Sequence, residues 1–353
     1  MEKCALQQTA EQHIPPLHSV SRVRVSTSID QTLATLRRCR SFITPSSTVA
    51  PSLRLAWQNA FIAHYGTGRE LAITMVGADS PQLLLPLQRR DRQTLSFICD
   101  ETADYNDFFF ERQADNHQEL LHDALRYWLN EKITRFDFSR IPADSRTVTA
   151  ICAAGHELGL KVSVADCDTM TVVDAHPGIA VEHWPGVRAT RIKKLQRRRR
   201  TLNRRFAVNY RLVETHPELD AALERAMQLH IDRWAARGIT SKFLDARRKA
   251  FTEEVCHAAL HAGTLMFSLL EVDGEIVSYQ LCFIGNKTAY WWNTSFALHW
   301  HTYSPGALLL LETLERGEEL GFNKLSFMRG DEAYKGLWST KTEHTLTITL
   351  ERT

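Results

Sequence analysis

Two polar segments in the last third of the chain combine residue types that bind phosphate and transfer protons. The first, Tyr303-Ser304-Pro305-Gly306-Ala307, leads into a run with the pattern of a helix. A helix N-terminus presents backbone N–H groups without partners and the positive end of the helix dipole, so it can bind phosphate. Proline early in a helix costs no hydrogen bond, and glycine lets the backbone approach a phosphate closely. The segment predicts an anion site, and its simpler interpretation is an ordinary helix cap.

The second segment runs from Arg329 to Lys335 and follows a predicted strand over residues 324–328. Polar clusters just after a strand often carry chemistry, because loops on a rigid frame hold functional groups. Arg329 and Lys335 can bind a phosphate or a carboxylate, and the arginine can do so bidentately. Asp331 can accept a proton from an incoming amine or hydroxyl, or simply fix Arg329. The alternative is a solvated turn held by salt bridges.

The composition describes a globular protein of two domains. The chain has 353 residues, of which 44% are hydrophobic and 24% charged, and this length exceeds one ordinary small domain. The seven cysteines are scattered and include no C-x-x-C pair, so we predict no disulfide framework, no metal site and a reducing compartment. The N-terminus lacks the apolar core of a signal peptide, and no run of about 18 apolar residues predicts a membrane span. We therefore expect a cytoplasmic protein, which can still dock on a membrane complex.

Alternation and helical periodicity divide the chain into two similar units after a flexible lead over residues 1–19. Unit 20–176 is predicted to contain two helices, a three-stranded meander, a loop, and then helix, strand, helix and two strands. Unit 177–353 follows much the same order, with Asp273-Gly274 as a two-residue hairpin turn. We therefore predict an α/β (α+β) fold of two tandem domains, each with a mixed, mostly antiparallel sheet flanked by helices. The predicted strands are 20–25, 70–76, 82–88, 94–98, 135–138, 161–164, 170–173, 207–213, 264–272, 275–284, 288–293, 324–328 and 344–350.

A basic segment over residues 188–205 begins the second unit. It holds ten basic residues and no acid. Ile192, Leu195, Leu202 and Phe206 recur at spacings that give one narrow apolar stripe on a helix. Ten cations cannot all pair within such a helix, so the segment is either a solvated face or a surface for a polyanion such as transfer RNA, anionic membrane lipids or a nucleotide-linked substrate. It does not resemble a reader of nucleic-acid sequence, so an RNA contact would be to phosphates.

The order of these elements resembles the GNAT acyltransferase fold, in which a meander, a phosphate-binding helix, a further strand and a polar turn follow one another. The segment from Tyr303 through Gly321-Phe322 to Lys335, with the basic helix before it, resembles the cellulose-biosynthesis CelD/BcsL-like group of GNAT proteins. That group is similar to the FemAB-type tandem-GNAT aminoacyltransferases. The resemblance covers about residues 20–350, and in the first unit it includes Trp57, Pro86-Leu87 and Asp104-Tyr105.

The resemblance implies a cleft for acyl-CoA between two strands that splay apart, here 275–284 and 288–293. A backbone amide of 275–284 would polarise the thioester carbonyl, and Gln280 and Cys282 on that strand would contact the donor. The pyrophosphate would lie on the loop from His301 to Ala307. That loop has fewer glycines than the usual GNAT loop and lacks its basic or glutamine entry residue. The candidate donor-binding residues in it are Tyr303, Ser304, Gly306 and Ala307.

The resemblance also implies roles on the acceptor side. Tyr334 matches the tyrosine that protonates the departing thiolate in many GNAT enzymes. His301 adjoins the phosphate loop and is a candidate for lining the cleft. Trp292 belongs to the aromatic run Tyr290-Trp291-Trp292, for which core packing is the alternative to a substrate platform.

These features predict an acyltransferase that uses acyl-CoA and no metal. The acceptor would be an amine or hydroxyl of a sugar, amino acid or polysaccharide precursor, with a role in cellulose or exopolysaccharide biosynthesis. One rival is the same fold fed by aminoacyl-tRNA, as in FemAB-like enzymes. A second rival is a non-catalytic scaffold of a polysaccharide synthase complex.

Overall fold

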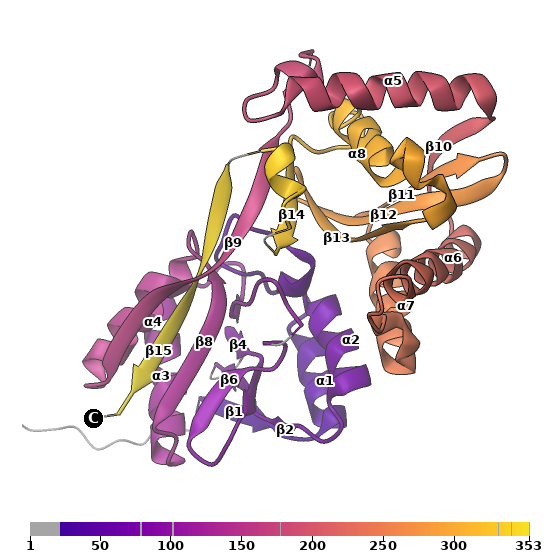
Figure 1. Cartoon of the computed structure of the whole chain (residues 1–353). Coiled ribbons are helices and arrows are strands. Elements are labelled where there is room, and N and C mark those ends of the chain that lie inside the picture. Colours follow the sequence, from indigo (N-terminus) through magenta and orange to yellow (C-terminus); the bar gives the residue numbers. More distant parts are fainter. Residues whose placement is uncertain are drawn as a thin grey trace, which may run out of the picture.

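Most strands join one long sheet. The computed structural model describes residues 22–77, 80–100, 102–176, 178–330, 332–339 and 341–352. Among these, eleven strands form a sheet in the order β10-β11-β12-β13-β14-β9-β15-β8-β6-β5-β2, and four form a smaller sheet in the order β1-β3-β4-β7. The long sheet runs from the N-terminal half into the C-terminal half (Figure 1). The strands are β1 (Val23–Ser26), β2 (Glu70–Leu71), β3 (Ile73–Val76), β4 (Leu83–Leu85), β5 (Leu87–Arg89), β6 (Thr94–Phe97), β7 (Phe109–Phe110), β8 (Arg135–Pro142), β9 (Lys161–Asp174), β10 (Val208–Leu212), β11 (Leu265–Val272), β12 (Glu275–Gly285), β13 (Thr288–Phe296), β14 (Lys324–Arg329) and β15 (Thr342–Glu351). The α-helices are α1 (Ile29–Arg38), α2 (Leu55–Tyr65), α3 (His117–Asn130), α4 (Arg146–Glu157), α5 (Ala189–Arg205), α6 (His216–Ala235), α7 (Ala246–His261) and α8 (Pro305–Glu315).

The two halves repeat one pattern, as the sequence predicts. In the second half β11, β12 and β13 form an antiparallel meander, and α8 then crosses to β14, which pairs parallel with β13. In the first half β5 and β6 pair antiparallel, and α3 then crosses to β8, which pairs parallel with β6. Parallel neighbours require a crossover of this kind. The predicted fold of two units, each with a mixed sheet and flanking helices, is confirmed.

Each half also receives one strand from the other. β9 belongs to the first half in sequence, but its last residues, 170–174, pair with β14 of the second half. β15 belongs to the second half in sequence, but it pairs with β8 on one edge and β9 on the other. Figure 1 shows β15 in yellow among the magenta strands of the first half. The sheet is therefore continuous across the predicted boundary at 176/177, and the division into 20–176 and 177–353 stays a prediction.

Several predicted strands differ from those observed. The predicted strands 70–76 and 82–88 are each divided between the two sheets, at Ala72 and at Pro86. Pro86 has no N–H, so it ends the ladder there. The predicted strands 161–164 and 170–173 are one strand, β9, because β15 pairs with the backbone between them. Residues 1–19 and the start of the predicted strand 20–25 lie outside the described residues.

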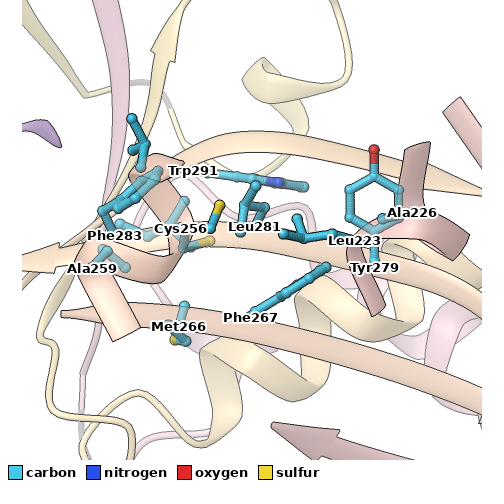
Figure 2. Close-up of a cluster of buried hydrophobic side chains, with 14 of the residues drawn as sticks. Leu223, Ala226, Cys256, Ala259, Met266, Phe267, Tyr279, Leu281, Phe283 and Trp291 are labelled. Carbon is cyan, nitrogen blue, oxygen red and sulfur yellow. The ribbon is translucent and has the colours of Figure 1, made fainter. Parts of the chain in front are cut away.

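β12 is buried on both faces and lies at the centre of the second half. One face packs against α6 and α7, and on the other face the Thr313 hydroxyl of α8 donates to Gln280 Oε1 at 2.8 Å. A strand covered on both faces needs a nearly continuous apolar run, and β12 supplies one. Figure 2 shows the packing on the first face, with Tyr279, Leu281 and Phe283 of β12 near Leu223 and Ala226 of α6 and Cys256 and Ala259 of α7.

The basic segment forms helix α5, as predicted, and α5 lies across α8 (Figure 1). Its apolar stripe is buried. Arg199 pairs with Glu312 of α8 at 3.2 Å and also with Glu315, so one edge of the helix is held by the fold. The remaining cations mostly face solvent. Those that are exposed and pair with no carboxylate among the described residues are Arg188, Lys193, Lys194, Arg197, Arg200, Arg204 and Arg205.

The exchanged strand β15 allows a test of how the halves depend on each other. Ile348 of β15 is fully buried in the hydrophobic core of the first half. Ile348→Ala leaves a cavity there, so we expect the free energy of unfolding to fall by about 2–5 kcal/mol, measured by urea denaturation. Thr347→Ala, one residue away and less buried, is the control and should change it by about 0.5 kcal/mol or less. Equal effects of the two changes would contradict a core role for β15.

Candidate active site

A cavity of about 1100 Å³ lies between the two halves of the chain. Its walls come from α2 and the loop after β6 in the first half, and from α6, α7, α8, β13 and β14 in the second. Small-molecule sites usually measure about 300–1,000 Å³, so this cavity has room for a large ligand or for two. Its basic lining residues outnumber its acidic ones, which favours anions. The basic residues are Arg191, Arg233, Arg237, Lys242, Arg248, Arg329 and Lys335, and the acidic ones are Asp104, Asp245 and Glu332.

β13 and β14 begin side by side and then diverge into this cavity. They pair only at residues 288–290 and 324–326. From Trp291 and Phe327 onward, residues of both strands line the cavity. Over that stretch β13 has no strand partner on its β14 side within the described part of the chain. Its backbone N–H and C=O groups there need other partners, and a ligand can supply them.

The prediction that 275–284 and 288–293 splay apart is wrong. β12 and β13 pair as a hairpin from Ser278 to Gly285, with one irregularity between Leu281 and Cys282, opposite Trp292. β12 is also paired with β11 on its other edge, so its amide groups are occupied and cannot polarise a carbonyl. A short turn holds hairpin strands together, whereas strands joined through a crossover helix can diverge. The available strand edge therefore belongs to β13.

The turn after β14 has a constrained backbone held by a buried amine. Met328 has φ +58°, a left-handed conformation that costs a non-glycine residue roughly 1–3 kcal/mol. The Lys335 amine donates to the carbonyl oxygens of Met328, Arg329 and Gly330 at 3.4, 2.9 and 3.2 Å. It also pairs with Glu332 at 2.8 Å, and the Lys335 side chain is 4% exposed. Lys335 therefore stabilises the turn, and its donors are already used within it.

This turn places Tyr334 against the rings of Trp291 and Phe327, which lie where β13 and β14 diverge and pack on each other with centroids 4.9 Å apart. The ring centroid of Tyr334 lies 6.2 Å from those of Trp291 and Phe327, one on each strand. The residue remains 37% exposed. Burial, with a smaller contribution from Glu332, raises the pKa of Tyr334 to about 12, while Arg233 opposes the shift. The phenol is therefore protonated at neutral pH and can donate a proton.

Arg329 links the same turn to the first half. Its guanidinium lies 3.4 Å from Asp104 Oδ1 and 3.9 Å from Asp168 Oδ2. Arg140 also pairs with Asp168, at 2.8 Å. Burial raises the pKa of Asp104, and Arg329 is the strongest opposing charge. Arg329 thus fixes a carboxylate of the first half in the wall of the cavity.

One group of cations, which we call the α8 pole, lies near the N-terminus of α8. It consists of Arg191, Arg233 and Arg237, which line the cavity with Gly306 and Ala307. The Arg233 guanidinium lies 4.3 Å from the ring centroid of Phe296, the last residue of β13. A Cβ at Gly306 would lie 3.4 Å from the same ring, so α8 begins close to the sheet.

The start of α8 offers few free amide groups. Pro305 has no N–H, and the N–H groups of Ala307 and Leu308 both donate to Ser304 O at 3.0 Å. Gly306 N–H is the remaining donor of the first turn. The Ser304 hydroxyl accepts from Arg198 of α5. An anion at this end of the cavity would therefore be held by arginines more than by the backbone.

A second group of cations, which we call the α7 pole, lies where α7 begins. It consists of Lys242 and Arg248, whose charged groups lie 5.6 and 5.3 Å from the ring centroid of Trp292. Burial and the neighbouring Arg248 lower the pKa of Lys242, and Asp104 opposes this. Lys242 is exposed to solvent in the cavity, so water screens part of this shift, and an anion beside the amine would favour its charged form.

A buried histidine lies beside the α7 pole. His230 Nδ1 is 2.8 Å from the Ser241 hydroxyl, and His230 lines the cavity. Burial, then Lys242, Arg233 and Arg248, lower the pKa of His230 to about 4. The imidazole is therefore neutral at neutral pH.

The cavity gathers about half of the residues predicted from sequence. Gly306, Ala307, Trp292, Arg329, Tyr334 and Lys335 line it. Five others do not: Tyr303 packs on Phe206 and Trp300, Ser304 bonds to Arg198, His301 is exposed, and Gln280 and Cys282 are buried in β12. Asp331 lies outside the described residues. Arg191 lies in the basic segment 188–205 that was predicted as a possible polyanion surface, whereas the other pole cations and His230 were not predicted. The spacing of Arg233 and Arg237 by four residues was a readable signal.

The first half has the same strand divergence, but its opening is filled. β6 and β8 pair only at residues 94–96 and 135–137. Beyond that point the rings of Phe97, Phe108 and Phe138 pack with centroids 5.1–5.3 Å apart and are at most 1% exposed. The surface at the start of α3 is acidic, with Asp115, Glu119 and Glu157, which disfavours phosphate. The geometry therefore supports one ligand-binding opening, in the second half.

Two further findings bear on cofactor and membrane use. Within the described ranges, no group of three His, Cys, Asp or Glu side chains is placed to hold a metal ion. No helix of the described chain is long and apolar enough to cross a membrane.

Comparison with known proteins identifies the fold. Residues 189–336 match the family model described as an acetyltransferase (GNAT) domain. The whole chain is similar to the crystal structure of FemX, at 11% identity and a TM-score of 0.57, over 92% of this chain and 96% of that one. It is also similar to the C-terminal domain of a putative lysylphosphatidylglycerol synthetase from Agrobacterium fabrum, at 11% identity and a TM-score of 0.54, over 92% and 93% of the two chains. The chain is also similar to L-PGS from Bacillus licheniformis, at 11% identity and a TM-score of 0.50, over 91% of each chain. No curated protein matches the sequence.

The buried amine of Lys335 predicts a stability effect. Lys335→Met leaves three carbonyl oxygens of the turn without their shared donor, so we expect the free energy of unfolding to fall by about 2–4 kcal/mol. The control is Lys341→Met, whose side chain is 54% exposed and forms a surface pair with Asp174; it should change stability by less than about 1 kcal/mol. Urea denaturation of both variants measures the difference. If Lys335→Met were as stable as the control, the amine would have a role other than holding the turn.

Proposed function

We propose that this protein, whose fold is that of two tandem GNAT-like units, is an acyltransferase working where β13 and β14 diverge, in the unit 177–353. The observation that carries the proposal is the divergence of two parallel strands at a cavity, with the protonated phenol of Tyr334 in the cavity lining beside it. The family match over 189–336 and the FemX-like fold support acyl or aminoacyl transfer in general terms.

The proposed chemistry uses the free edge of β13 and the phenol. A nucleophilic amine or hydroxyl forms a bond to the acyl carbon, and the bond to the leaving group breaks. Backbone N–H groups of β13 beyond Tyr290 stabilise the negative charge that develops on the acyl oxygen. Tyr334 donates its proton to the departing atom. Asp331 remains the proposed acceptor of the proton that the nucleophile loses.

The proposed donor is acyl-CoA, which supplies the activated acyl group and several phosphates. The residues of the α8 pole fit such a polyanion, because three arginines line the cavity beside Gly306 and Ala307. Ser304 and Tyr303 lie on the same loop, and Ser304 is tied to Arg198. Gln280 and Cys282 are buried in β12, so the geometry gives them no contact with a donor in the cavity.

The proposed acceptor is an amine or hydroxyl of a sugar, amino acid or polysaccharide precursor. Trp291 and Trp292 both line the cavity, and indole faces stack well on sugar rings. Arg329 pairs with Asp104, and we propose that it also binds the acceptor. A role in cellulose or exopolysaccharide biosynthesis, a polysaccharide synthase partner and a cytoplasmic location rest on the sequence and its resemblance.

An aminoacyl-tRNA donor is the second candidate, and the exposed cations of α5 favour it. Arg188 and six exposed cations of α5, none of them paired with a carboxylate in the described part of the chain, form a surface suited to a nucleic-acid backbone or to anionic lipids. Nuclease treatment of the purified protein separates the donors. If transfer activity survives nuclease treatment and needs only acyl-CoA, the donor is not aminoacyl-tRNA.

The donor site predicts a selective binding defect. CoA should raise the melting temperature of the protein, because a ligand that binds only the native state stabilises it. Arg233→Gln in the α8 pole should weaken CoA binding roughly tenfold, the effect of losing one charged hydrogen bond. Arg225→Gln on the same helix, which breaks a pair with Glu275 outside the cavity, is the control and should not change the affinity measured by calorimetry.

Two outcomes would count against this donor. If Arg233→Gln and the control bind CoA with equal affinity, the phosphates of CoA do not bind at Arg233. No thermal shift with CoA or its acyl esters would favour the scaffold alternative. Native mass spectrometry of the protein as purified would add the mass of any co-bound donor.

Tyr334 predicts a defect in turnover without one in binding. Tyr334→Phe removes only the transferable proton, so kcat should fall about a hundredfold while CoA affinity stays the same. Thiol release from acetyl-CoA in the presence of amine acceptors measures kcat. Tyr127→Phe on α3, far from the cavity lining, is the control. An unchanged kcat for Tyr334→Phe would remove this residue from the catalytic mechanism.

A further inference from the structure

The α7 pole brings two cations together on one wall of the cavity. Lys242 and Arg248 lie against the same indole, that of Trp292, and each cation lies close enough to disfavour the other's charge. No carboxylate forms an ion pair with either of them among the described residues. The Nε of Arg248 is buried without an acceptor. Two adjacent cations held this way are stabilised by an anion between or beside them.

The groups around the pole do not supply that anion. Asp104 of the first half and Asp245 before α7 both favour the charge of Arg248. The ion pair of Asp104 is with Arg329 at 3.4 Å. Asp245 caps α7 and lies 4.0 Å from Arg247. Tyr65 of α2 offers Arg248 a hydroxyl, which carries no charge at neutral pH because burial raises the pKa of Tyr65. His230 on α6 is neutral and also adjoins Lys242. The two cations thus face the cavity without a carboxylate in ion-pair contact, within the part of the chain that the structure describes.

The position of the α7 pole separates it from the α8 pole. Trp292 lies under the α7 pole and Phe296 under Arg233 of the α8 pole. Four residues along a strand span about 13 Å, with the opening beside Tyr334 close to the Trp292 end. A donor whose phosphates lie at the α8 pole would present its acyl group at that opening. The acceptor must then arrive from the other side, where the α7 pole is.

We propose that Lys242 and Arg248, over the face of Trp292, form a subsite for an anionic group, a phosphate or a carboxylate, of the acceptor substrate. The proposal rests on the transferase function proposed above and narrows its acceptor to an anionic molecule. Arg248 provides a planar fork for two oxygens and Lys242 a mobile point charge. Trp292 gives an apolar face for the ring or chain that carries the anion.

Matched sugars test the subsite in the full-length protein. Glucose 1-phosphate and glucuronate carry a phosphate and a carboxylate on the same ring, and glucose carries neither. In ligand-observed NMR titrations at low salt, at least one charged sugar should bind more tightly than glucose. Lys242→Gln and Arg248→Gln should each weaken that binding roughly tenfold, as expected for loss of one charged hydrogen bond. Lys242→Arg should restore it, which also shows that the position tolerates substitution.

Neighbouring cations outside the cavity lining provide controls. Arg247→Gln and Lys249→Gln remove the same charge from the same helix and should leave the sugar affinities unchanged. The tighter of the two charged sugars identifies the anion as phosphate or carboxylate. If neither binds more tightly than glucose, or if the controls weaken binding as much as Lys242→Gln and Arg248→Gln, the proposal is wrong.

CoA titrations of the same variants separate this inference from the donor assignment. Lys242→Gln should leave CoA affinity unchanged, whereas Arg233→Gln lowers it. If Lys242→Gln lowers CoA affinity as much as Arg233→Gln does, the α7 pole belongs to the donor site and the acceptor subsite is overturned. If no variant nor the wild-type protein binds CoA, the donor assignment fails while the result with the sugars still decides the subsite.

Discussion

The exchange of β9 and β15 between the halves is the constraint on which the site depends. β9 holds β14 from one side, and β15 joins β9 to β8 of the first half. The turn after β14 therefore has a fixed position relative to the loop that carries Asp104. The pair between Arg329 and Asp104 and the links through Asp168 to Arg140 cross this junction. A cavity between two domains joined only by a linker would change shape with domain motion, whereas this one is built on a single sheet.

The two halves show how one architecture is used for packing and for binding. In each half a crossover helix lets a parallel pair of strands diverge. In the first half phenylalanine rings fill the gap, and the adjacent helix start is acidic. In the second half the rings of Trp291 and Phe327 pack on each other, Tyr334 packs against both, and all three line a cavity that also has arginines in its lining. Side-chain volume and charge sign, rather than backbone topology, decide which opening can hold an anionic ligand.

Local sequence patterns predicted the elements better than their partners. The basic helix, the α8 start and the polar turn after β14 follow from short-range periodicity and turn chemistry, and all three are found. The strand exchange was not predictable, because nothing in the composition of β15 specifies β8 and β9 as its neighbours. The resemblance assigned the splay to 275–284 and 288–293. These strands are consecutive in sequence and form a hairpin, and the divergence lies one strand further on, between β13 and β14. Arg233, Lys242 and Arg248 were missed because a cation on a helix is usually a solvated charge, and only the fold shows that these three face a cavity.

The placement of the cations would let a donor and an acceptor bind in one cavity, each at its own position. A cavity lined evenly with cations would bind any anion in several orientations, and few of these would bring reacting atoms together. Here the cations form two groups at opposite ends of a stretch of β13, and Trp292 and Phe296 mark the ends. Tyr334 lies against the rings of Trp291 and Phe327, and the charged groups of its own turn are held in ion pairs, Arg329 with Asp104 and Lys335 with Glu332. On the proposal above, the anionic groups of the donor and the acceptor bind at the two poles, and the reactive groups that they carry meet where β13 and β14 diverge. The same separation explains the neutral phenol, because Tyr334 lies where desolvation outweighs the nearest cation and therefore keeps its proton.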